Sequence, residues 1–556
     1  MSGNVTSRDP GAGNAPLPAP NVAALLARNA DRFGDRAFLR FEDQVWTHAE
    51  YVDRCRRFAT WLEGLGPDEN GRLHVGVILD NVPAWLVALG GCGIAGATLV
   101  GINTTRSADE VVRDATHTEV SVLVHGDEHG DRAAALAALT KPERTLHVDD
   151  LDPLLDATDP VGLEEPDVAS TWCLVFTSGS TADPKAVICS QRRMLTTGER
   201  MRLVLDINPD DVGYVSMPLF HSNSLMVGVM PALVTGASVA LARRFSASGW
   251  LPDVRRHGAT WFNYTGKPLA YILATPEQPD DADNPMRRGF GNEGSAATVK
   301  AFEQRFGVEL IDAFGPTEGG IAILPDPDTP AGALGRAGEH VQVVDTEGYP
   351  VPPGKVGEIV NTAGPGPFEG YWGNEAASHR ATRYGWYWTG DLGWIDEDGF
   401  LWFAGRNDDW IRVDGENFSA APIERILAEH PDVVVAAVYA VPDPEAGDQV
   451  MAALVLREGA SLDGEAFAAW IDGRRDLAQK HRPRFVRASR QLPTTGTNKI
   501  LTRQLRHERF RLDRVGDDDL WHRPNRAGPF VRFDEDAQAE LHAAFEAADR
   551  LRFWDS

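Results

Sequence analysis

The spacing of apolar positions predicts alternating helices and strands in the first part of the 556-residue chain. Apolar residues recur at helical spacing over residues 22–33, and residues 38–46 are typical of a hairpin. Residues 47–65 begin with Thr47 and carry Glu50 three positions later, which predicts a capped amphipathic helix. Short β-type runs then alternate with helical segments, so the sequence predicts a layered α/β fold.

The pattern changes near Gly405 and predicts a second domain. Residues 410–456 contain a strand, a helix at 421–429 and two β-rich runs, which is typical of a small α+β lid of about 100 residues. After Asp513 an acidic, proline-containing linker is expected, followed by a helix within 535–553. The predicted organisation is a disordered arm (1–20), a large multi-layer N-terminal domain (21–406), a small mobile C-terminal lid (407–515) and an extension with a terminal helix (516–556).

One apolar segment raises the question of a membrane span. Residues 86–102 carry no charge but contain several glycines, and the segment is slightly short for a span. We expect a buried helix that leads into a buried parallel strand, and no integral membrane span.

Composition and charge narrow the class of protein. The hydrophobic content of 43% is ordinary for a globular enzyme. A formal net charge of -27 argues against nucleic acid or an anionic membrane as the main partner. The four cysteines are far apart and show no C-x-x-C spacing, and no secretory signal is visible, so we expect buried thiols in a cytoplasmic protein.

Residues 177–185, T-S-G-S-T-A-D-P-K, are the strongest candidate for binding phosphate. They follow an apolar strand-like run, and their backbone N–H groups and hydroxyls can donate to anionic oxygens. The pattern lacks the G-K-[ST] of a Walker loop, and a serine- and threonine-rich surface turn is the alternative. The candidate phosphate-binding residues are Thr177, Ser178, Gly179, Ser180, Thr181 and Lys185.

Further motifs follow in order: D-A-F-G-P-T-E-G-G at 312–320, Y-W-T-G-D at 387–391, G-R-N-D-D-W-I-R-V-D-G at 405–415, and L-P-T-T-G-T-N-K at 492–499. With the phosphate loop they resemble the core motifs of the adenylate-forming (ANL) superfamily, from about residue 20 to 515. Three features resemble the fatty-acid-transport and very-long-chain acyl-CoA synthetase branch: P-L-F-H-S-N-S at 218–224, F-G-N-E-G at 290–294 and the L-P-T-T-G-T-N-K form of the last motif.

The resemblance implies roles for residues of the large domain. Phe314, with Gly315, would offer a flat face to adenine, Thr317 would contact the α-phosphate, and Glu318 would bind Mg²⁺ together with Thr177. Residues Asn292, Glu293 and Gly294 would frame the adenine edge and the acyl tunnel. The superfamily usually has Tyr at Phe314 and a Gly near Ala182–Asp183, so this chain departs from the pattern there.

The later motifs imply the remaining roles. Asp391 and Arg406 would bind the ribose, and Lys499 would bridge the carboxylate and the α-phosphate during adenylation. Asp408 occupies the hinge position and Arg412 the position of a basic residue used in thioester formation. Asn498 stands where the pattern has Gly.

Three residues are expected to line the substrate pocket: His221, Tyr264 and Gly319. His221 is equally compatible with a hydrogen-bonded core histidine, and the aromatic run around Tyr264 with plain core. The stretch H-G-D-E-H at 125–129 superficially suggests a metal site, but we expect a solvated turn.

The sequence therefore predicts an ATP- and Mg²⁺-dependent acid:CoA ligase that activates a hydrophobic carboxylic acid as acyl-AMP and then forms acyl-CoA. Alternatives that use the same nucleotide residues are carrier-protein loading or a split half-reaction, and an ATP-dependent diazotase that uses nitrite and an aryl amine. A non-catalytic nucleotide-binding relative is disfavoured because Lys499, Glu318 and Asp391 are all present. A homodimer and an acyl-carrier protein partner stay open, as do roles in fatty acid metabolism or natural-product biosynthesis.

Overall fold

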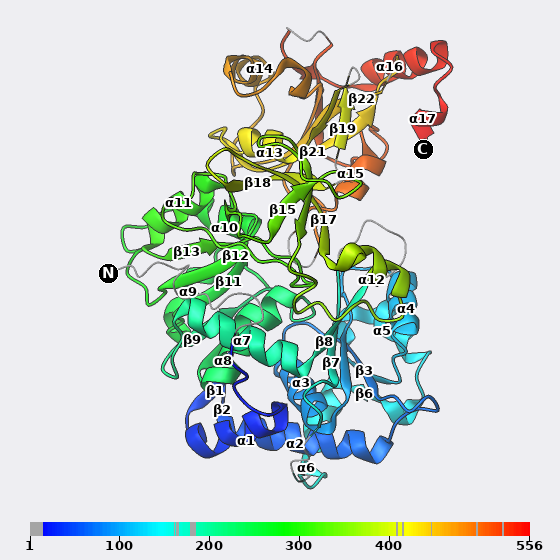
Figure 1. Ribbon diagram of the computed structural model, residues 1–556. Helices are drawn as coiled ribbons and strands as arrows, with labels where there is room; N and C mark the ends of the chain where they lie inside the picture. Colours follow the sequence, from blue (N-terminus) through cyan, green and yellow to red (C-terminus); the bar gives the residue numbers. More distant parts are fainter. Residues whose placement is uncertain are drawn as a thin grey trace. The chain divides into compact units, whose positions relative to one another are not determined.

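The computed structural model describes residues 15–160, 162, 166–177, 185–406, 410–413, 416–445, 447–495, 499–524 and 528–555 (Figure 1). The chain divides into two compact units. The first contains residues 1–342, 360–389 and 397–401, and the second contains residues 343–359, 390–396 and 402–556. Helices and strands are mixed in both, which confirms the α/β class. The expected domain boundaries at residues 20, 406 and 515 stay predictions.

The first unit contains a six-stranded sheet with the order β6-β5-β3-β4-β7-β8. Its neighbouring strands are parallel except β7 and β8. Parallel strands are covered on both faces, which explains why β3 is buried along its whole length. The strands are β3 (His74–Ile78), β4 (Thr98–Gly101), β5 (Val122–His125), β6 (Thr145–His147), β7 (Thr171–Phe176) and β8 (Ala186–Ser190). The helices of this region are α2 (His48–Leu65), α3 (Pro83–Ala95), α4 (Ala108–His117), α5 (Gly130–Ala137) and α6 (Leu151–Asp156).

The apolar segment 86–102 forms the end of α3 and all of β4, the predicted buried helix and parallel strand. Its glycines allow α3 to approach α2 closely. A Cβ at Gly90 would lie 2.4 Å from Cys55 Sγ, and one at Gly91 would lie 2.5 Å from Phe58 Cδ1. No helix in the described parts of the chain is long and apolar enough to cross a membrane. All four cysteines are buried and unbridged, as expected.

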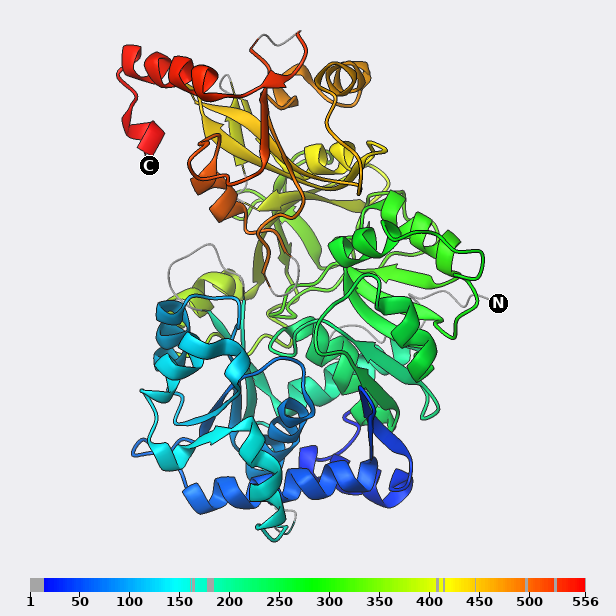
Figure 2. The same cartoon turned by 180° about the vertical axis from the view of Figure 1, so that it is seen from behind.

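The second sheet of the first unit has seven strands in the order β13-β12-β11-β9-β10-β1-β2. Its strands are β1 (Ala37–Phe41), β2 (Gln44–Thr47), β9 (Val212–Val215), β10 (Ser238–Leu241), β11 (Trp261–Thr265), β12 (Arg288–Asn292) and β13 (Glu309–Asp312). The β1–β2 hairpin is the predicted one, and Thr47 and Glu50 form the predicted capping box of α2. Figure 2 shows α1 and α2, both in blue, at the same edge of this unit.

Helices and one π-helix accompany this sheet. They are α1 (Val22–Phe33), α7 (Gln191–Leu205), the π-helix η5 (Ser224–Val229), α8 (Met230–Thr235), α9 (Trp250–His257), α10 (Gly266–Leu273) and α11 (Ala296–Phe306). An aromatic core cluster around Trp250, Phe262, Tyr264 and Phe302 covers one face of the sheet. The π-helix was not expected from the sequence.

A five-stranded sheet has the order β14-β18-β17-β16-β15. Its strands are β14 (Gly335–Arg336), β15 (Val341–Val344), β16 (Gly357–Asn361), β17 (Tyr387–Ile395) and β18 (Phe400–Arg406), and α12 (Glu375–Ala381) precedes β17.

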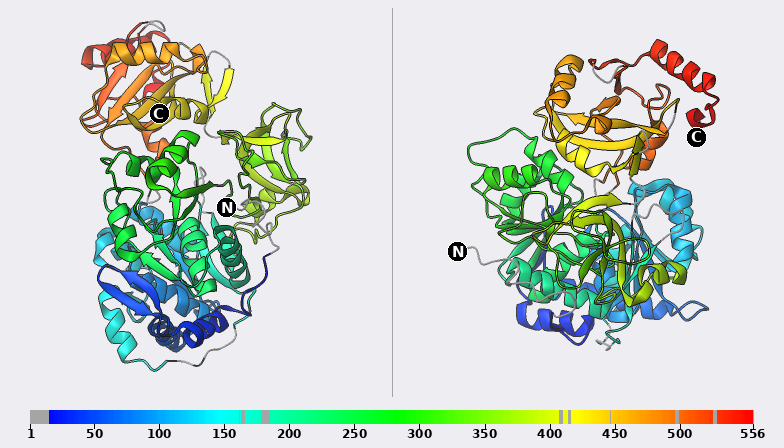
Figure 3. Two further views of the ribbon diagram at one scale, coloured as in Figure 1. Left: turned by 90° about the vertical axis from the view of Figure 1, so that its left-hand side faces the viewer. Right: turned by 45° about the horizontal axis from the view of Figure 1, so that its top comes forward.

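The second unit is built on a sheet with the order β21-β22-β23-β24-β25, and Figure 3 shows α14, in orange, lying across it. The predicted helix and β-rich runs are present as α13, β21 and β22. The elements are β19 (Trp410–Val413), β20 (Glu416–Ser419), α13 (Ala421–Leu427), β21 (Val433–Pro442), β22 (Asp448–Leu456), α14 (Gly464–Gly473), β23 (Phe485–Ser489), α15 (Thr502–Glu508), β24 (Asp519–His522), β25 (Val531–Arg532), α16 (Glu535–Ala547) and α17 (Arg552–Asp555).

The expected linker after Asp513 is wrong, because β24 lies within it and pairs with β23. Phe530 is 2% exposed and belongs to the core of the second unit. Arg523 is also buried, and its guanidinium donates to both carboxylate oxygens of Asp472 on α14. The residues after 515 therefore complete the sheet instead of hanging from it, and α16 follows as the predicted terminal helix.

Candidate functional site

The ends of the candidate phosphate loop are held together by the β7–β8 hairpin. The Thr177 N–H donates to the Lys185 carbonyl at 3.1 Å, and both residues are half-buried. Residues 178–184, which include Ser178, Gly179, Ser180 and Thr181, lie outside the described residues. The hairpin therefore fixes where the loop begins and ends.

Lys185 and Glu318 are brought together through Tyr371. The segment around Tyr371 runs alongside β8, since Trp372 N donates to Ala186 O and Ile188 N donates to Gly370 O. The Lys185 amine lies 5.8 Å from the Tyr371 ring centroid, and the Tyr371 hydroxyl donates to Glu318 Oε1 at 2.6 Å. Two predicted site residues are thus linked by a tyrosine that sequence reasoning did not single out.

Thr317 is held from two sides. Its hydroxyl is 2.9 Å from that of Ser222, in the segment that leads into η5. The guanidinium of Arg193 on α7, buried at 4% exposure, donates to the Thr317 carbonyl and also to Ile188 O. Ser222 and Arg193 were not predicted. Gly319, two residues later, adopts a positive φ of 75°, which glycine tolerates best.

The segment Asn292 to Gly294 begins at the last residue of β12 and is held by a buried carboxylate. Gly294 N donates to Asp312 Oδ2 at 2.8 Å, and the Tyr264 hydroxyl donates to the same oxygen at 3.2 Å. The strand register places Tyr264, Gly291 and Asp312 side by side. A Cβ at Gly291 would lie 2.6 Å from Tyr264 Cδ2, so the missing side chain lets Tyr264 reach Asp312.

Burial raises the pKa of Asp312 to about 7, against the hydrogen bonds from Gly294 and Tyr264, which lower it. Asp312 opens the D-A-F-G-P-T-E motif but received no role in the sequence analysis. Its signal would have been a carboxylate at the end of a strand beside a glycine-rich turn. Phe314 follows and pairs through its backbone with Ile323.

The predicted pocket residues occupy different environments. His221 is half-buried, its ring centroid lies 4.4 Å from that of Phe220, and it precedes η5. Tyr264 is 1% exposed and packs within the aromatic core cluster. Its hydroxyl donates a hydrogen bond to Asp312. That Tyr264 lines a substrate pocket stays a prediction.

The remaining site residues belong to the second unit. Asp391 lies on β17 and is 3% exposed. Arg406 lies on β18 and Arg412 on β19. The structure describes only the backbone of these two arginines, and Asp408 lies outside the described residues. Lys499 is half-buried, and its N–H donates to Thr495 Oγ1 at 3.1 Å while its carbonyl accepts from Thr495 N at 2.7 Å. These two bonds join Lys499 to Thr495.

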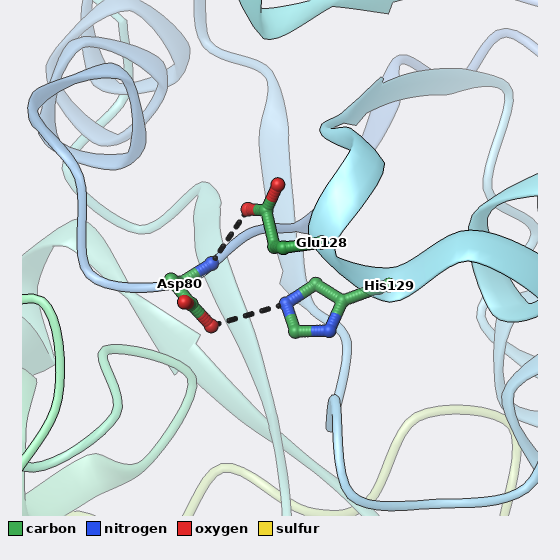
Figure 4. A group of neighbouring side chains, drawn as sticks. All are labelled: Asp80, Glu128 and His129. Atoms are coloured by element: carbon green, nitrogen blue, oxygen red, sulfur yellow. Dashed lines mark hydrogen bonds and ion pairs between the residues drawn. The ribbon is translucent and has the colours of Figure 1, made fainter.

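Asp80, Glu128 and His129 form a group outside these motifs (Figure 4). Strands β3 and β5 are parallel neighbours, so the residues after them meet at one edge of the sheet. His129 Nε2 lies 3.3 Å from Asp80 Oδ1, and this interaction lowers the pKa of Asp80. One possible ligand atom from each of Asp80, Glu128 and His129 lies within 4.8 Å of the other two, which is close enough to hold a metal ion. The expected solvated turn is a three-residue 3-10 helix, Asp127–His129, with Asp127 and Glu128 exposed, and its histidine pairs with Asp80.

Comparison with known proteins places these features in a family. The AMP-binding enzyme family matches residues 26–372, and the AMP-binding enzyme C-terminal domain matches residues 422–499. Steroid-22-oyl-CoA synthetase of Rhodococcus jostii is 43% identical over 94% of this chain and 97% of its own. Medium/long-chain-fatty-acid–CoA ligase FadD17 of Mycobacterium tuberculosis is 46% identical over 88% of this chain and 96% of its own.

A solved anthranilate CoA ligase in complex with anthranoyl-AMP shares the fold, with a TM-score of 0.77 over 88% of this chain and 97% of that chain at 24% identity. The chain belongs to the family of AMP-binding enzymes. Within it, the protein is an AMP-forming acid–thiol ligase, an acyl-CoA synthetase that uses ATP and CoA. The expected ligase reaction is therefore confirmed.

The finer placement is corrected by the same relatives. They are named for steroid and for medium- and long-chain fatty acids, not as members of the fatty-acid-transport or very-long-chain branch. The sequence prediction of that branch rested on a few short motifs, among them those at 218–224 and 290–294. So few motifs do not distinguish branches of the superfamily that have the same nucleotide-binding residues.

Proposed function

We propose that the acid is a hydrophobic one, either a medium- or long-chain fatty acid or an acid with a steroid skeleton. The observation that carries this proposal is the identity of 43% to 46%, over nearly the whole length, to ligases named for such acids. The net charge of -27 disfavours binding of the protein to an anionic membrane surface. We therefore expect the acid to reach the site from solution or from a carrier rather than from such a surface.

The nucleotide half of the site is proposed to lie around Lys185, Thr317 and Glu318. ATP phosphates would lie at the loop between Thr177 and Lys185, and Phe314 with Gly315 would face adenine. Asn292 has a buried Oδ1 that accepts no hydrogen bond from the described residues, so it could accept one from the adenine amine. Asp391 and Arg406 are proposed for the ribose.

Glu318 is well suited to hold Mg²⁺. Tyr371 donates to one carboxylate oxygen, and no other described residue donates to the second, which leaves a hard oxygen ligand beside the proposed phosphate site. Thr177 would be a further ligand. When bound, Mg²⁺ would neutralise the charge between the triphosphate and this carboxylate.

Adenylation joins a carboxylate oxygen of the acid to the α-phosphorus and releases pyrophosphate. We assign Lys499 the task of stabilising the charge that builds up there, and Thr317 a hydrogen bond to the α-phosphate. The CoA sulfur then bonds to the acyl carbon, the thiol proton is lost and AMP leaves. Arg412 is proposed to serve this second step and Asp408 to be the hinge between the two conformations.

The test measures AMP, pyrophosphate and acyl-CoA by mass spectrometry with a panel of acetate, benzoate, octanoate, palmitate and a cholanic acid, with and without CoA. Thioesters of octanoate, palmitate or the cholanic acid are expected to dominate. Preferential turnover of acetate or benzoate would contradict the proposal.

A Lys499→Ala variant tests the catalytic cation. Loss of the ammonium is expected to lower the adenylation rate by about 10² to 10³, because a transition-state charge loses its partner. Lys355→Ala removes the same charge from an exposed position of the same unit and serves as the matched control. Equal rates for Lys499→Ala and Lys355→Ala would contradict the assignment.

A further inference from the structure

Strand β11 presents different chemistry to its two faces. Successive side chains of a strand point to opposite faces, so Phe262 and Tyr264 share the aromatic core cluster while Asn263 lies on the other face. That face meets the π-helix η5: Trp261 Nε1 donates to Val227 O, and a Cβ at Gly228 would lie 3.2 Å from Asn263 Oδ1. A polar side chain of β11 therefore lies at the contact with η5.

The orientation of the Asn263 amide follows from its neighbour. Asn223 Nδ2 donates to the backbone carbonyl of Tyr264 at 3.3 Å, so Asn223 Oδ1 must face Asn263. Asn263 Nδ2 donates to that oxygen at 2.8 Å. The amide nitrogen of Asn263 is thus used for this bond. Its Oδ1 accepts no hydrogen bond from the described residues, although Asn263 is only 2% exposed.

Ser224 supplies a second oxygen of the same kind. It is 0% exposed, and its Oγ also has no partner among the described residues. Ser224 precedes Gly228 by four residues in η5, which is close to one turn of a π-helix, so both face the same side. Gly228 faces Asn263, and the two unpartnered oxygens therefore belong to one interface.

Buried polar atoms without a partner are rare because their lost hydration is not replaced. Two of them beside a π-helix, a feature that often marks functional sites, point to a ligand group. The ligand is the acyl chain rather than the nucleotide, because Ser222, just before η5, already bonds Thr317 at the proposed α-phosphate position. The helix then continues from that point along the face of β9 and β11.

We propose that Asn263 and Ser224 select an acyl substrate that carries a hydroxyl group. A hydroxyl can donate to Asn263 Oδ1 and accept from the Ser224 Oγ–H, which pairs both atoms. Because residue 228 is a glycine, η5 packs closely against Asn263 at this point: a Cβ there would lie 3.2 Å from Asn263 Oδ1 and 2.7 Å from Val215 Cγ2. This inference rests on the proposed function, since it names a feature of the acid that the same site activates.

The experiment compares kcat/KM for matched acids with the wild-type enzyme. The pairs are a cholanic acid with its ring-hydroxylated counterparts, and saturated fatty acids with their hydroxylated counterparts. At least one hydroxylated acid is expected to exceed its partner by about tenfold or more, as expected for a site built to bond a hydroxyl. The matching oxo acid can accept from Ser224 but cannot donate to Asn263, so its advantage is expected to be smaller.

Asn263→Leu and Ser224→Ala then assign the preference to these residues. Each variant is expected to bring the ratio of hydroxylated to plain acid toward one, whereas Ser248→Ala, at an exposed serine, is expected to leave it unchanged. Ser224→Ala removes a single atom and keeps the test valid if Asn263→Leu does not fold.

The outcomes separate three failures. Equal kcat/KM within every pair for the wild-type enzyme would overturn the inference, since the two oxygens would then be paired by buried water alone. A preference that neither variant reduces would overturn the assignment to Asn263 and Ser224. Absence of any medium-chain, long-chain or steroid thioester would instead overturn the proposed function.

Discussion

The two faces of strand β11 differ in how completely their polar groups are paired. On the Tyr264 face, the only polar atom of that side chain donates to Asp312, which also accepts the Gly294 N–H. On the Asn263 face, Asn263 Oδ1 and Ser224 Oγ are buried and have no hydrogen-bond partner among the described residues. A fully hydrogen-bonded network is suited to fixing the position of the segment that is proposed to contact the nucleotide. Polar atoms without a partner are suited to a surface where the substrate supplies the missing hydrogen bonds.

The largest effect is expected at the proposed metal position, Glu318. Glu318→Gln keeps the size of the side chain and its bond to Tyr371 but removes the negative charge that Mg²⁺ requires. We expect the adenylation rate to fall by about 10² or more. ATP–pyrophosphate exchange at increasing Mg²⁺ measures the loss. An unchanged rate would contradict the proposal that Glu318 binds Mg²⁺ at the nucleotide site.

Gly266→Ala tests how rigid the nucleotide side is. A Cβ there would lie 1.8 Å from the carbonyl oxygen of Glu293 and 2.8 Å from Gly294 Cα, so backbone must move. We expect a loss of about 2 to 3 kcal/mol in the free energy of unfolding and a higher KM for ATP. Urea unfolding and initial rates measure both. A normal KM for ATP would show that the segment 292–294 does not contact the nucleotide.

Gly228→Ala is the counterpart on the Asn263 face. Its Cβ would lie 2.7 Å from Val215 Cγ2, a side-chain atom that can shift more easily than backbone. We expect a smaller loss of stability, about 1 to 2 kcal/mol, and a change in the acids accepted with little change in the KM for ATP. Kinetics with varied acid and then varied ATP separate the two. A change confined to the KM for ATP would contradict the proposal that the Asn263 face contacts the acid and not the nucleotide.

The smallest effect is a pH dependence from Asp312. Burial raises the folded-state pKa to about 7 from its ordinary value of 3.8, so between these values the folded protein binds more protons than the unfolded chain. Stability from this group is complete at low pH and is lost as pH rises toward 7. Between pH 6 and 7 the wild type is expected to lose about 1 kcal/mol more than Asp312→Asn. Urea unfolding at both pH values measures this, and parallel curves would contradict it.

Local signals in the sequence predicted much of the fold. Thr47 and Glu50 form the expected capping box, and the glycine-containing apolar segment forms α3 and β4. These predictions succeeded because each depends on residues a few positions apart. The strand β24 was missed, because it lies in a polar, proline-containing stretch and forms by pairing with β23.

The sequence by itself determined the class of protein, because the chemistry of adenylation requires particular residues in short ordered motifs. Tertiary structure alone decided which side chains meet: Tyr371 joins Glu318 and Lys185, and Arg193 and Ser222 hold Thr317. It also decided that Asn263 and Ser224 lie at one interface. These partners are far apart in the chain, and only packing determines whether a buried polar atom finds a partner.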